Sequence, residues 1–400
     1  MKTLFILFLC ILLIGIWFTI DFHLGRKKHL SLVKSISFPK RKSTITLYTA
    51  GEELFDKMFD DIRNACHHIH IEFYIVKNDK ISKRFISLLK KKATEGVEVR
   101  LLLDWMGSLS FKGKTIKELR NSGVKFAYSH APKFPFFFYS SQERNHRKIT
   151  IIDGHIGYLG GFNIGKEYIG ADPKLSPWRD YHLRIKGEGV QDLEMVYLTD
   201  WQEATGATLN TKQIYIQRDG TGVHSHQIIP TEGAFLEEQF ISLIQKATTS
   251  IIIGTPYFIP SNRIMNELLK VLKAGITLSI IVPYESDHLL VKEASYTYFR
   301  KLLEVGATVY QYQKGFFHAK YILIDEQILD IGTANFDKRS LFLNHEVNCF
   351  IYDKNCIQNF KKAIDQDIQN STILSFRDLS NVSTWIKLKE KMAHLLSSFL

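Results

Sequence analysis

The 400-residue sequence predicts an α/β protein made of two similar lobes, each a mixed sheet flanked by helices. A pseudo-two-fold axis is expected to relate the lobes, and one transmembrane helix to precede them. Three observations support this prediction: a short His/Lys motif occurs twice, strand-like and helix-like runs alternate in the same order around each copy, and a long apolar run opens the chain. We expect an anchor over 1–22, a basic linker over 23–43, a first lobe over 44–208 and a second lobe over 209–400.

The apolar run extends from Leu4 to Ile20 and is interrupted only by Thr19 among polar residues. At about 1.5 Å per residue, it is just long enough to span a hydrocarbon core. A cleaved signal peptide is the alternative, but no small-residue cleavage site follows the run. Basic residues are frequent from Arg26 to Lys42, whereas Lys2 alone precedes the run. The positive-inside rule therefore predicts a single-pass protein of the cell membrane with its lobes on the cytoplasmic side.

The composition limits the class of partner. A formal net charge of +11 indicates a polyanion or an anionic surface, and both nucleic acid and anionic lipid meet that condition. The four cysteines (Cys10, Cys66, Cys349 and Cys356) form no paired framework, so the sequence does not indicate an oxidising compartment. With 45% hydrophobic residues, the chain can bury substantial cores.

The lobes are predicted from alternating strand and helix signals, with glycine after several of the helices. The first lobe is expected to contain a strand at 69–76, a helix at 82–95, a strand at 97–104, a helix at 114–121 and a strand at 124–128. The second repeats this order with a helix at 235–247, a strand at 250–255, a helix at 264–274, a strand at 276–282, a helix at 296–304 and a strand at 308–312. This duplication predicts a site at the lobe interface.

Two features of the first lobe have alternative interpretations. His67, His68 and His70 could suggest a metal cluster, but no further ligands follow at suitable spacing, so ordinary strand-edge residues are favoured. The proline-broken stretch from Ala131 to Tyr139 is rich in phenylalanine. It could form an apolar lip for acyl chains or a buried contact between the lobes.

The C-terminal tail has an amphipathic pattern. Its lysines lie off an apolar stripe. We expect the stripe to pack against the body of the protein, with contact to a membrane surface as the alternative. The stripe consists of Trp385, Leu388, Met392, Leu395, Leu396 and Phe399.

The duplicated motif is His-x-Lys, four residues, Asp, six residues, and then Gly-x-x-Asn. Each copy predicts a β-hairpin, and His and Lys at i and i+2 share one face of an extended segment. Two copies facing each other would surround one pocket with two imidazoles, two ammonium groups and two amides. The residues are His146, Lys148, Asp153 and Asn163 in the first copy, and His318, Lys320, Asp325 and Asn335 in the second.

This set of side chains suits attack on a phosphodiester. One neutral histidine can act as the nucleophile while the other, protonated, donates to the leaving alcohol. The lysines and asparagines can stabilise the phosphate oxygens without a metal. Each histidine needs an orienting carboxylate, for which Asp180 and Glu346 are candidates. Asp153 and Asp325 complete the motifs and are expected to brace them. The alternative, surface residues on two ordinary hairpins, explains two matching copies poorly.

With these motifs the chain resembles the phospholipase D superfamily, and more closely the bacterial cardiolipin synthases. The closer resemblance is to the minor type with one N-terminal transmembrane segment, and it extends from about residue 45 to the C-terminus. His345 departs from it, because an aromatic residue is usual there. The matching segments are Thr255-Pro-Tyr-Phe-Ile-Pro260, Ser286-Asp-His288, Gly315-Phe-Phe-His-Ala-Lys320 and Gly332-Thr-Ala-Asn-Phe-Asp-Lys-Arg-Ser-Leu-Phe-Leu-Asn-His-Glu-Val-Asn348.

The resemblance implies phosphatidyl transfer between two phosphatidylglycerol molecules, giving cardiolipin and glycerol through a phosphatidyl-histidine intermediate. It implies His146 as nucleophile and His318 as general acid and base, with neither a metal nor another cofactor. The expected partners are a membrane and anionic phospholipids, phosphatidylglycerol and cardiolipin. A hydrolytic phospholipase D, a nuclease and a membrane scaffold are the alternatives. Nucleic acid is not expected, because aromatic residues are rarely interleaved with basic ones.

Overall fold

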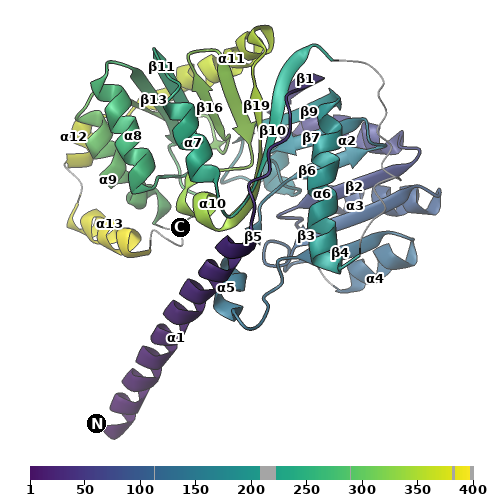
Figure 1. The fold of residues 1–400 in the computed structure, drawn as a ribbon, viewed down its shortest axis with the longest axis horizontal. Helices are drawn as coiled ribbons and strands as arrows, with labels where there is room; N and C mark the ends of the chain where they lie inside the picture. Colours follow the sequence, from purple (N-terminus) through teal and green to yellow (C-terminus); the bar gives the residue numbers. More distant parts are fainter. Residues whose placement is uncertain (112, 208–221, 289, 381–382, 397–400) are drawn as a thin grey trace.

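The computed structural model describes residues 1–111, 113–207, 222–288, 290–380 and 383–396. A helix projects from a body in which helices cover a large twisted sheet (Figure 1). The predicted α/β class with two similar halves and one N-terminal apolar helix is confirmed.

The sheet contains two halves with the same strand order. The first half consists of β1 (Arg41–Tyr48), β2 (His68–Phe73), β3 (Glu98–Asp104), β4 (Lys125–Ser129), β6 (Ile149–Ile152), β7 (Ile156–Gly160) and β9 (His182–Gly187). The second consists of β10 (His224–Glu232), β11 (Ser250–Gly254), β13 (Thr277–Pro283), β14 (Thr308–Tyr312), β16 (Tyr321–Ile324), β17 (Ile328–Gly332) and β19 (Asn344–Ile351), with β20 (Ser371–Ile373) at its edge.

The strand orders β4-β3-β2-β6-β7-β9-β1 and β14-β13-β11-β16-β17-β19-β10 correspond one to one. In each half three adjacent strands are parallel, β2, β3 and β4 in the first and β11, β13 and β14 in the second, and the other pairings of the halves, including that of β20, are antiparallel. The halves join where β1 pairs with β10, with Arg41 opposite His226, so one sheet runs through both lobes. The expected division at residue 208 lies at the start of 208–221, outside the described residues, and the lobe boundaries stay a prediction.

Helices lie on both faces of the sheet, and some of them begin at a side-chain cap. The Asp79 carboxylate accepts from the backbone N–H of Ser82, and the Ser261 hydroxyl from that of Ile264. The helices of the body are α2 (Gly51–Arg63), α3 (Lys80–Thr94), α4 (Gly113–Asn121), α5 (Phe137–Gln142), η1 (Lys166–Ile169), α6 (Gly189–Thr205), α7 (Leu236–Ile244), α8 (Asn262–Lys273), α9 (Val291–Leu303), α10 (Lys338–Phe342), α11 (Lys354–Gln369), α12 (Phe376–Ser380) and α13 (Thr384–Leu396). Of these, α5, η1, α6, α10, α11 and α12 were not predicted, and α9 begins earlier than expected.

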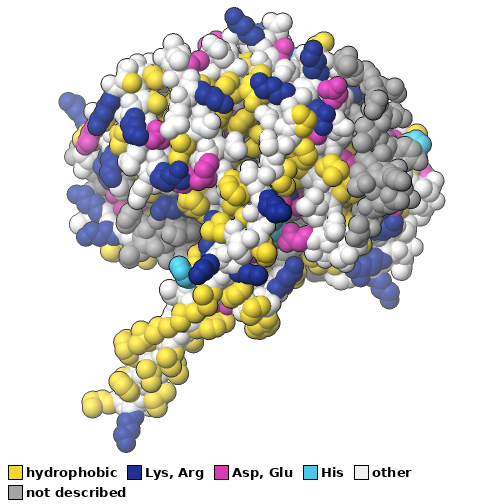
Figure 2. Space-filling view, viewed as in Figure 1, with side chains coloured by type: hydrophobic (Ala, Val, Ile, Leu, Met, Phe, Trp, Pro, Cys, Tyr) yellow, Lys and Arg dark blue, Asp and Glu magenta, His cyan; other side chains and the backbone are white. Residues whose placement is uncertain are grey.

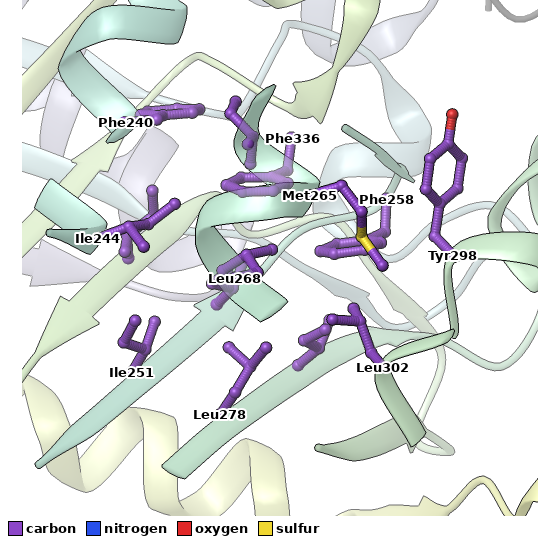
Figure 3. Close-up of a cluster of buried hydrophobic side chains, with 14 of the residues drawn as sticks. Phe240, Ile244, Ile251, Phe258, Met265, Leu268, Leu278, Tyr298, Leu302 and Phe336 are labelled. Atoms are coloured by element: carbon purple, nitrogen blue, oxygen red, sulfur yellow. The ribbon is translucent and has the colours of Figure 1, made fainter. Parts of the chain in front are cut away.

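Three apolar cores support the sheet, one under the outer strands of each half and one at the centre. The core of the second half packs α7, α8 and α9 on β11 and β13 (Figure 3). Three phenylalanine rings stack within it: Phe336 lies 5.4 Å from Phe240 and 5.2 Å from Phe258, between ring centroids. This packing fixes the strand ends from which the functional side chains project.

The N-terminal helix α1 (Lys2–Leu32) is long and apolar enough to cross a membrane. It continues beyond the expected anchor, and β1 begins at Arg41, so the basic linker predicted over 23–43 is wrong for most of its length. The reason is that the end of α1 docks on the body. The Asp21 carboxylate accepts from the backbone N–H of Tyr139 at 2.9 Å, and Arg26 Nη1 donates to the Gly233 carbonyl at 2.6 Å.

The segment from Ala131 to Tyr139 was expected to form an apolar lip or a buried contact between the lobes. In the structure one part of it is buried against α1 and another part is exposed. Phe138 stacks on Phe18 of α1 at 4.3 Å between centroids, and Tyr139 is buried beside the same helix. Phe134 and Phe137 remain exposed. The buried part of the segment therefore serves α1.

The predicted packing of the C-terminal stripe against the body is wrong for the side chains that the structure describes. Trp385, Leu388 and Met392 point outward, whereas Ala393 is buried. Ion pairs hold the polar edge of α13 against α9 and so turn the apolar stripe away from it. The side chains of Leu395 and Leu396, and all of Phe399, lie outside the described residues.

Candidate active site

Both motifs form the predicted hairpins, β6 with β7 and β16 with β17. Each histidine and lysine lies in the extended segment just before the first strand of its hairpin. Side chains alternate there, so His146 and Lys148 share one side while Arg147 is buried on the other. The local pattern of the sequence thus places an imidazole beside an ammonium group in each lobe.

Short strands that cross between the lobes bring the two motifs together. β5 (Arg144–Asn145) pairs with β19, and β8 (Trp178–Arg179) pairs with β15 (Phe316–Phe317). The ladders continue into the motifs: the backbone N–H of His146 donates to the His345 carbonyl at 2.9 Å, and that of His318 to the Arg179 carbonyl at 2.7 Å. Each lobe therefore holds the backbone of the other lobe's histidine.

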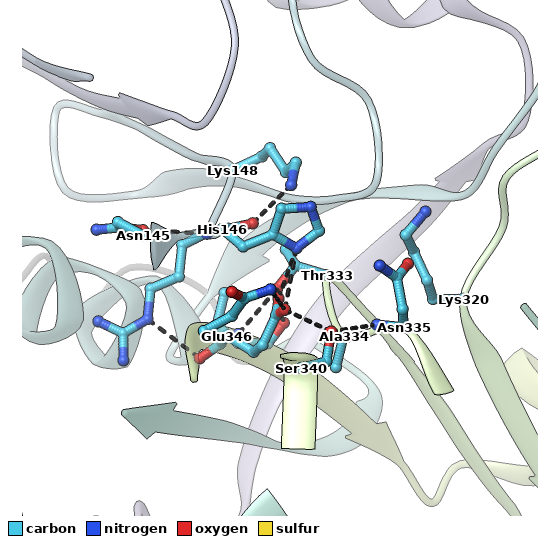
Figure 4. Close-up of polar contacts among 12 residues, drawn as sticks. Asn145, His146, Lys148, Lys320, Thr333, Ala334, Asn335, Ser340 and Glu346 are labelled. Atoms are coloured by element: carbon cyan, nitrogen blue, oxygen red, sulfur yellow. Dashed lines mark hydrogen bonds and ion pairs between the residues drawn. The ribbon is translucent and has the colours of Figure 1, made fainter. Parts of the chain in front are cut away.

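Each histidine also contacts a carboxylate from the opposite lobe. His146 Nδ1 lies 3.0 Å from both Glu346 carboxylate oxygens (Figure 4). His318 Nδ1 lies 2.6 Å from Asp180 Oδ2. With Nδ1 donating to the carboxylate, Nε2 of each ring is the nitrogen left for chemistry. The structure brings both candidate carboxylates to the histidines, in a crossed arrangement.

The two carboxylates are themselves held in place. Glu346 accepts from the hydroxyls of Thr333 at 2.6 Å and Ser340 at 2.8 Å (Figure 4). Asp180 accepts from the backbone N–H of Tyr181 at 2.8 Å, and a Cβ on Gly161 would lie 2.0 Å from Asp180 Oδ1. The second glycine of the first motif thus leaves room for this carboxylate. No role was predicted for Thr333 or Gly161. Their position inside the two motifs is the feature of the sequence that could have indicated one.

The two lysines are fully buried beside the histidines. Lys148 Nζ donates to the His146 carbonyl at 2.6 Å, and Lys320 Nζ lies 2.6 Å from His318 Nδ1. Burial lowers the pKa of Lys148 to about 7 and that of Lys320 to about 8. An anion in the pocket would raise both pKa values, because it favours the charged ammonium groups.

The histidines are neutral in the free protein at neutral pH. Burial lowers the pKa of His146, and burial together with the charge of Lys320 lowers the pKa of His318 to about 4. Burial would raise the pKa of Asp180, but Lys320 and His318 hold it below its ordinary value. A neutral imidazole with an ionised carboxylate behind it is the form in which a histidine is nucleophilic.

The site opens into a pocket of about 660 Å³ between the lobes. His146, His318, Asn163 and Asn335 all line it, as do aromatic and arginine side chains. The Asn335 side-chain oxygen has no hydrogen-bond partner among the described residues. The other lining side chains that bear on recognition are Tyr74, Trp178, Tyr257, Arg144, Arg339, Asp287 and His288.

Asp153 and Asp325 do not line this pocket. The Asp153 carboxylate accepts from the backbone N–H groups of Cys66, His67 and His68 at 2.7–2.9 Å. Asp325 accepts from those of residues 248–250 in the same way. Their position at the hairpin turns supports the expected bracing role and separates them from the two histidines and two asparagines that line the pocket.

Replacing Asp153 by alanine is expected to lower the free energy of unfolding by about 1–3 kcal/mol, because three backbone N–H groups, one buried and two partly buried, lose their acceptor. Turnover by the protein that remains folded should stay within about twofold of the wild type, since the pocket is unchanged. Thermal melting and initial rates measure the two effects. Asp56→Ala, at an exposed position in the same lobe, should change neither. A stable Asp153→Ala protein with strongly reduced turnover would contradict the bracing role.

A buried network behind His146 was missed by the sequence analysis. Arg147 Nη1 contacts both Asp200 oxygens at 2.5 and 2.6 Å, and Arg147 Nε donates to the Glu346 carbonyl at 3.1 Å. Asn145 Nδ2 donates to Asp200 at 3.0 Å. Arg147 is adjacent to the motif histidine, but its partner lies on α6 at no recognisable spacing. This network ties the first motif to β19.

Two groups of side chains have the composition of metal ligands. His68, His70 and Glu194 are buried together, so the prediction of ordinary strand-edge residues is wrong for His68 and His70, whereas His67 is exposed. The reason is that β2 is an interior strand and Glu194 of α6 packs on it. Arg100 Nη1 lies 2.5 Å from His70 Nε2, and this positive charge opposes a cation. The second group, His130, Glu203 and His345, lies near α1 and outside the pocket lining.

The fold and the paired motifs define a phospholipase D-like protein. The family model described as "Cardiolipin synthase, PLD-like domain" matches residues 58–173 and 240–368. The chain is 40% identical over 400 residues to minor cardiolipin synthase ClsB of Bacillus subtilis, covering 100% of both chains. It is 37% identical over 376 residues to a cardiolipin synthase of Oceanobacillus iheyensis, covering 93% of this chain and 78% of that one.

Solved structures show the same fold. The phosphatidylserine synthase of Haemophilus influenzae Rd KW20 superposes with a TM-score of 0.72 and 16% identity, covering 94% of this chain and 99% of that one. The chain therefore belongs to the cardiolipin synthase family of phospholipase D-like enzymes. This confirms the predicted family, and with it a phosphatidyltransferase.

Proposed function

We propose that this enzyme makes cardiolipin and glycerol from two molecules of phosphatidylglycerol, with His146 and His318 carrying the reaction. The observation that carries the proposal is the pair of buried histidines in one pocket, each backed by a carboxylate and flanked by a lysine. The family relationship supports the lipid substrate, and the geometry supports phosphodiester chemistry.

In the first half-reaction, Nε2 of neutral His146 attacks the phosphorus of phosphatidylglycerol. A P–N bond forms, the P–O bond to the glycerol headgroup breaks, and protonated His318 gives its proton to the leaving oxygen. The pKa of His318, about 4 in the free protein, has to rise when the anionic phosphate binds next to it. Glu346 stabilises the positive charge that develops on His146.

In the second half-reaction, neutral His318 takes the proton from the headgroup hydroxyl of a second phosphatidylglycerol. That oxygen attacks the phosphorus, the P–N bond breaks, and cardiolipin and His146 are released. Lys148, Lys320, Asn163 and Asn335 stabilise the non-bridging oxygens in both steps. Their ammonium and amide groups supply the charge stabilisation that the pentacoordinate transition state requires.

Membrane attachment is part of the proposal. Helix α1 fits a single-pass anchor, and the basic residues at its C-terminal end favour the cytoplasmic side for the body. The substrate would then be reached at the inner surface of the membrane, where anionic headgroups also attract this positively charged chain.

The direct test uses purified full-length protein in vesicles of phosphatidylglycerol, with lipid products separated and glycerol assayed. We expect cardiolipin with an equal amount of released glycerol. Phosphatidic acid in place of cardiolipin would mean that water is the acceptor and would overturn the transferase assignment. Absence of any lipid product would overturn the proposal that the substrate is a lipid.

Binding of a soluble phosphodiester such as glycerophosphoglycerol should take up protons at pH 8. At pH 8 Lys148, with a pKa of about 7, is largely neutral, and Lys320, with a pKa of about 8, is about half neutral; the anion raises both pKa values. From the lysines we expect an uptake of about one proton at pH 8 and little at pH 6, where they are already charged, whereas protonation of His318 contributes mainly at pH 6. Calorimetry in buffers of different ionisation enthalpy measures it.

The lysines can be tested separately in the same experiment. Lys148→Met should remove most of the uptake, whereas Lys314→Met, at an exposed position outside the pocket, should preserve it. Binding without proton uptake at pH 8 would show that both ammonium groups are already charged in the free protein.

A further inference from the structure

Helix α13 presents its apolar stripe to the outside. Its opposite edge is fixed to α9: Glu390 accepts from two Arg300 nitrogens at 2.7 and 2.8 Å. The exposed fractions of Trp385, Leu388 and Met392 are 64%, 47% and 48%. Water is a poor environment for such a continuous apolar stripe, so it indicates a further apolar contact.

A second group of exposed apolar side chains lies beside α1. The rings of Phe134, which is 82% exposed, and Phe137 lie 5.4 Å apart. The next residue, Phe138, stacks on Phe18 of α1. Phe134 and Phe137 therefore lie next to the helix that fits a membrane span. In Figure 1, α5 lies beside α1, and α13 lies on the side of the body from which α1 projects.

The elements that carry both groups lie next to elements that line the catalytic pocket. Arg144, which follows α5, lines the pocket, and so does Arg339, whose guanidinium donates to the Gln142 carbonyl at the end of α5. For the other group, Val291 at the start of α9, the helix to which α13 is fixed, lines the same pocket. A surface that included α5 and α13 would thus hold the pocket close to whatever it contacts.

Basic side chains accompany both apolar groups. Lys387 and Lys391 are exposed on α13 one helical turn apart, and Lys133 is exposed beside Phe134. Figure 2 shows further basic side chains around the junction of α1 with the body. Apolar residues with flanking lysines are the combination that binds the interface of an anionic bilayer.

We propose that α13 and the Phe134–Phe137 segment form an interfacial surface that inserts into the bilayer spanned by α1. Trp385, Leu388 and Met392 enter the boundary between headgroups and acyl chains, and the lysines bind anionic headgroups. Contacts beyond α1 would stop the body from tilting and keep the pocket at the depth of the lipid phosphates. This surface does not depend on which phosphodiester is turned over.

The depth of α13 can be measured in the full chain. The exposed Cys10 and Cys66 are replaced by serine, and Leu388→Cys carries an environment-sensitive fluorophore in phosphatidylglycerol vesicles. Lipids with a nitroxide near the headgroup should quench this label strongly. The matched control is Met195→Cys on α6 of the other lobe, 40% exposed, which should not be quenched.

Two results of this experiment would overturn the proposal. An unquenched label at position 388 would show that α13 stays in water. A label shielded in detergent micelles as protein concentration rises would show that a second copy of the chain covers the stripe. Neither result depends on turnover, so the experiment can reject the proposed membrane surface without rejecting the proposed function.

Turnover gives a second test. The double variant Trp385→Glu/Leu388→Glu should lose roughly tenfold in rate on vesicles, the effect of no longer burying large apolar side chains. With phosphatidylglycerol dispersed in detergent it should match the wild type, as Met195→Glu should in both assays. An equal loss in both assays would mean that α13 acts on the protein and not on the membrane.

Discussion

Replacing His146 by alanine is expected to reduce turnover on the order of 10⁴-fold or more, because the nucleophile is removed. His318→Ala removes the general acid and should cost roughly 10²- to 10⁴-fold. Initial rates of cardiolipin formation measure both effects. The matched control is His155→Ala, in the turn of the first hairpin and outside the pocket lining, which should retain the wild-type rate.

The two histidines can be distinguished by the leaving group. A p-nitrophenyl phosphodiester of the lipid needs no proton on its leaving oxygen, so His318→Ala should still release nitrophenol and accumulate a phosphatidyl adduct on His146. His146→Ala should do neither. An adduct found on His318 would reverse the assignment, and near-wild-type turnover by either variant would contradict the two-histidine mechanism.

The second large effect is expected for the carboxylates behind the histidines. Asp180→Asn and Glu346→Gln preserve shape but replace an acceptor-only carboxylate by a neutral amide that can also donate, so the imidazole tautomer is no longer fixed. We expect a loss of roughly 10²- to 10⁴-fold in turnover. The measurement is kcat against pH. Since the Asp180 charge raises the pKa of His318, its removal lowers that pKa further and should move the pH optimum downward.

The crossed pairing makes this prediction specific. Asp180→Asn should behave like His318→Ala, including its partial rescue by the p-nitrophenyl leaving group, although Asp180 is in the other lobe. Glu346→Gln should behave like His146→Ala and show no rescue. Asp192→Asn, at a buried carboxylate that pairs with Arg41 outside the pocket, is the matched control. The opposite pattern of rescue would show that each carboxylate serves the histidine of its own lobe.

Much of the fold could be predicted because it follows from local patterns. Alternating apolar runs define the strands, glycines such as Gly96 and Gly275 end helices in the left-handed region, and Asp153 occupies a hairpin turn. The duplicated spacing placed His and Lys side by side in each copy, since side chains alternate along any extended segment. None of these inferences needs a contact between distant residues.

The contacts between the lobes could not be obtained in that way. His146 is 200 residues from Glu346, and His318 is 138 residues from Asp180. The sequence nominated both carboxylates but did not indicate that they would cross, because this depends on β5 pairing with β19 and β8 with β15. The Arg147–Asp200 pair was missed for the same reason.

By itself, then, the sequence determined the α/β class, the duplication, the two hairpins with their His-Lys pairs and the apolar N-terminal helix. Each of these follows from local patterns of the chain, and the duplication from finding the same local pattern twice. The tertiary structure decided which lobe supplies each carboxylate, how the end of α1 docks on the body, and which way α13 faces. For α13 the periodicity defined an apolar stripe, but Arg300 and Glu293 of α9 bind the opposite, polar edge and turn the stripe outward. An amphipathic pattern specifies that a helix has two faces, and the neighbouring elements determine which of them is covered.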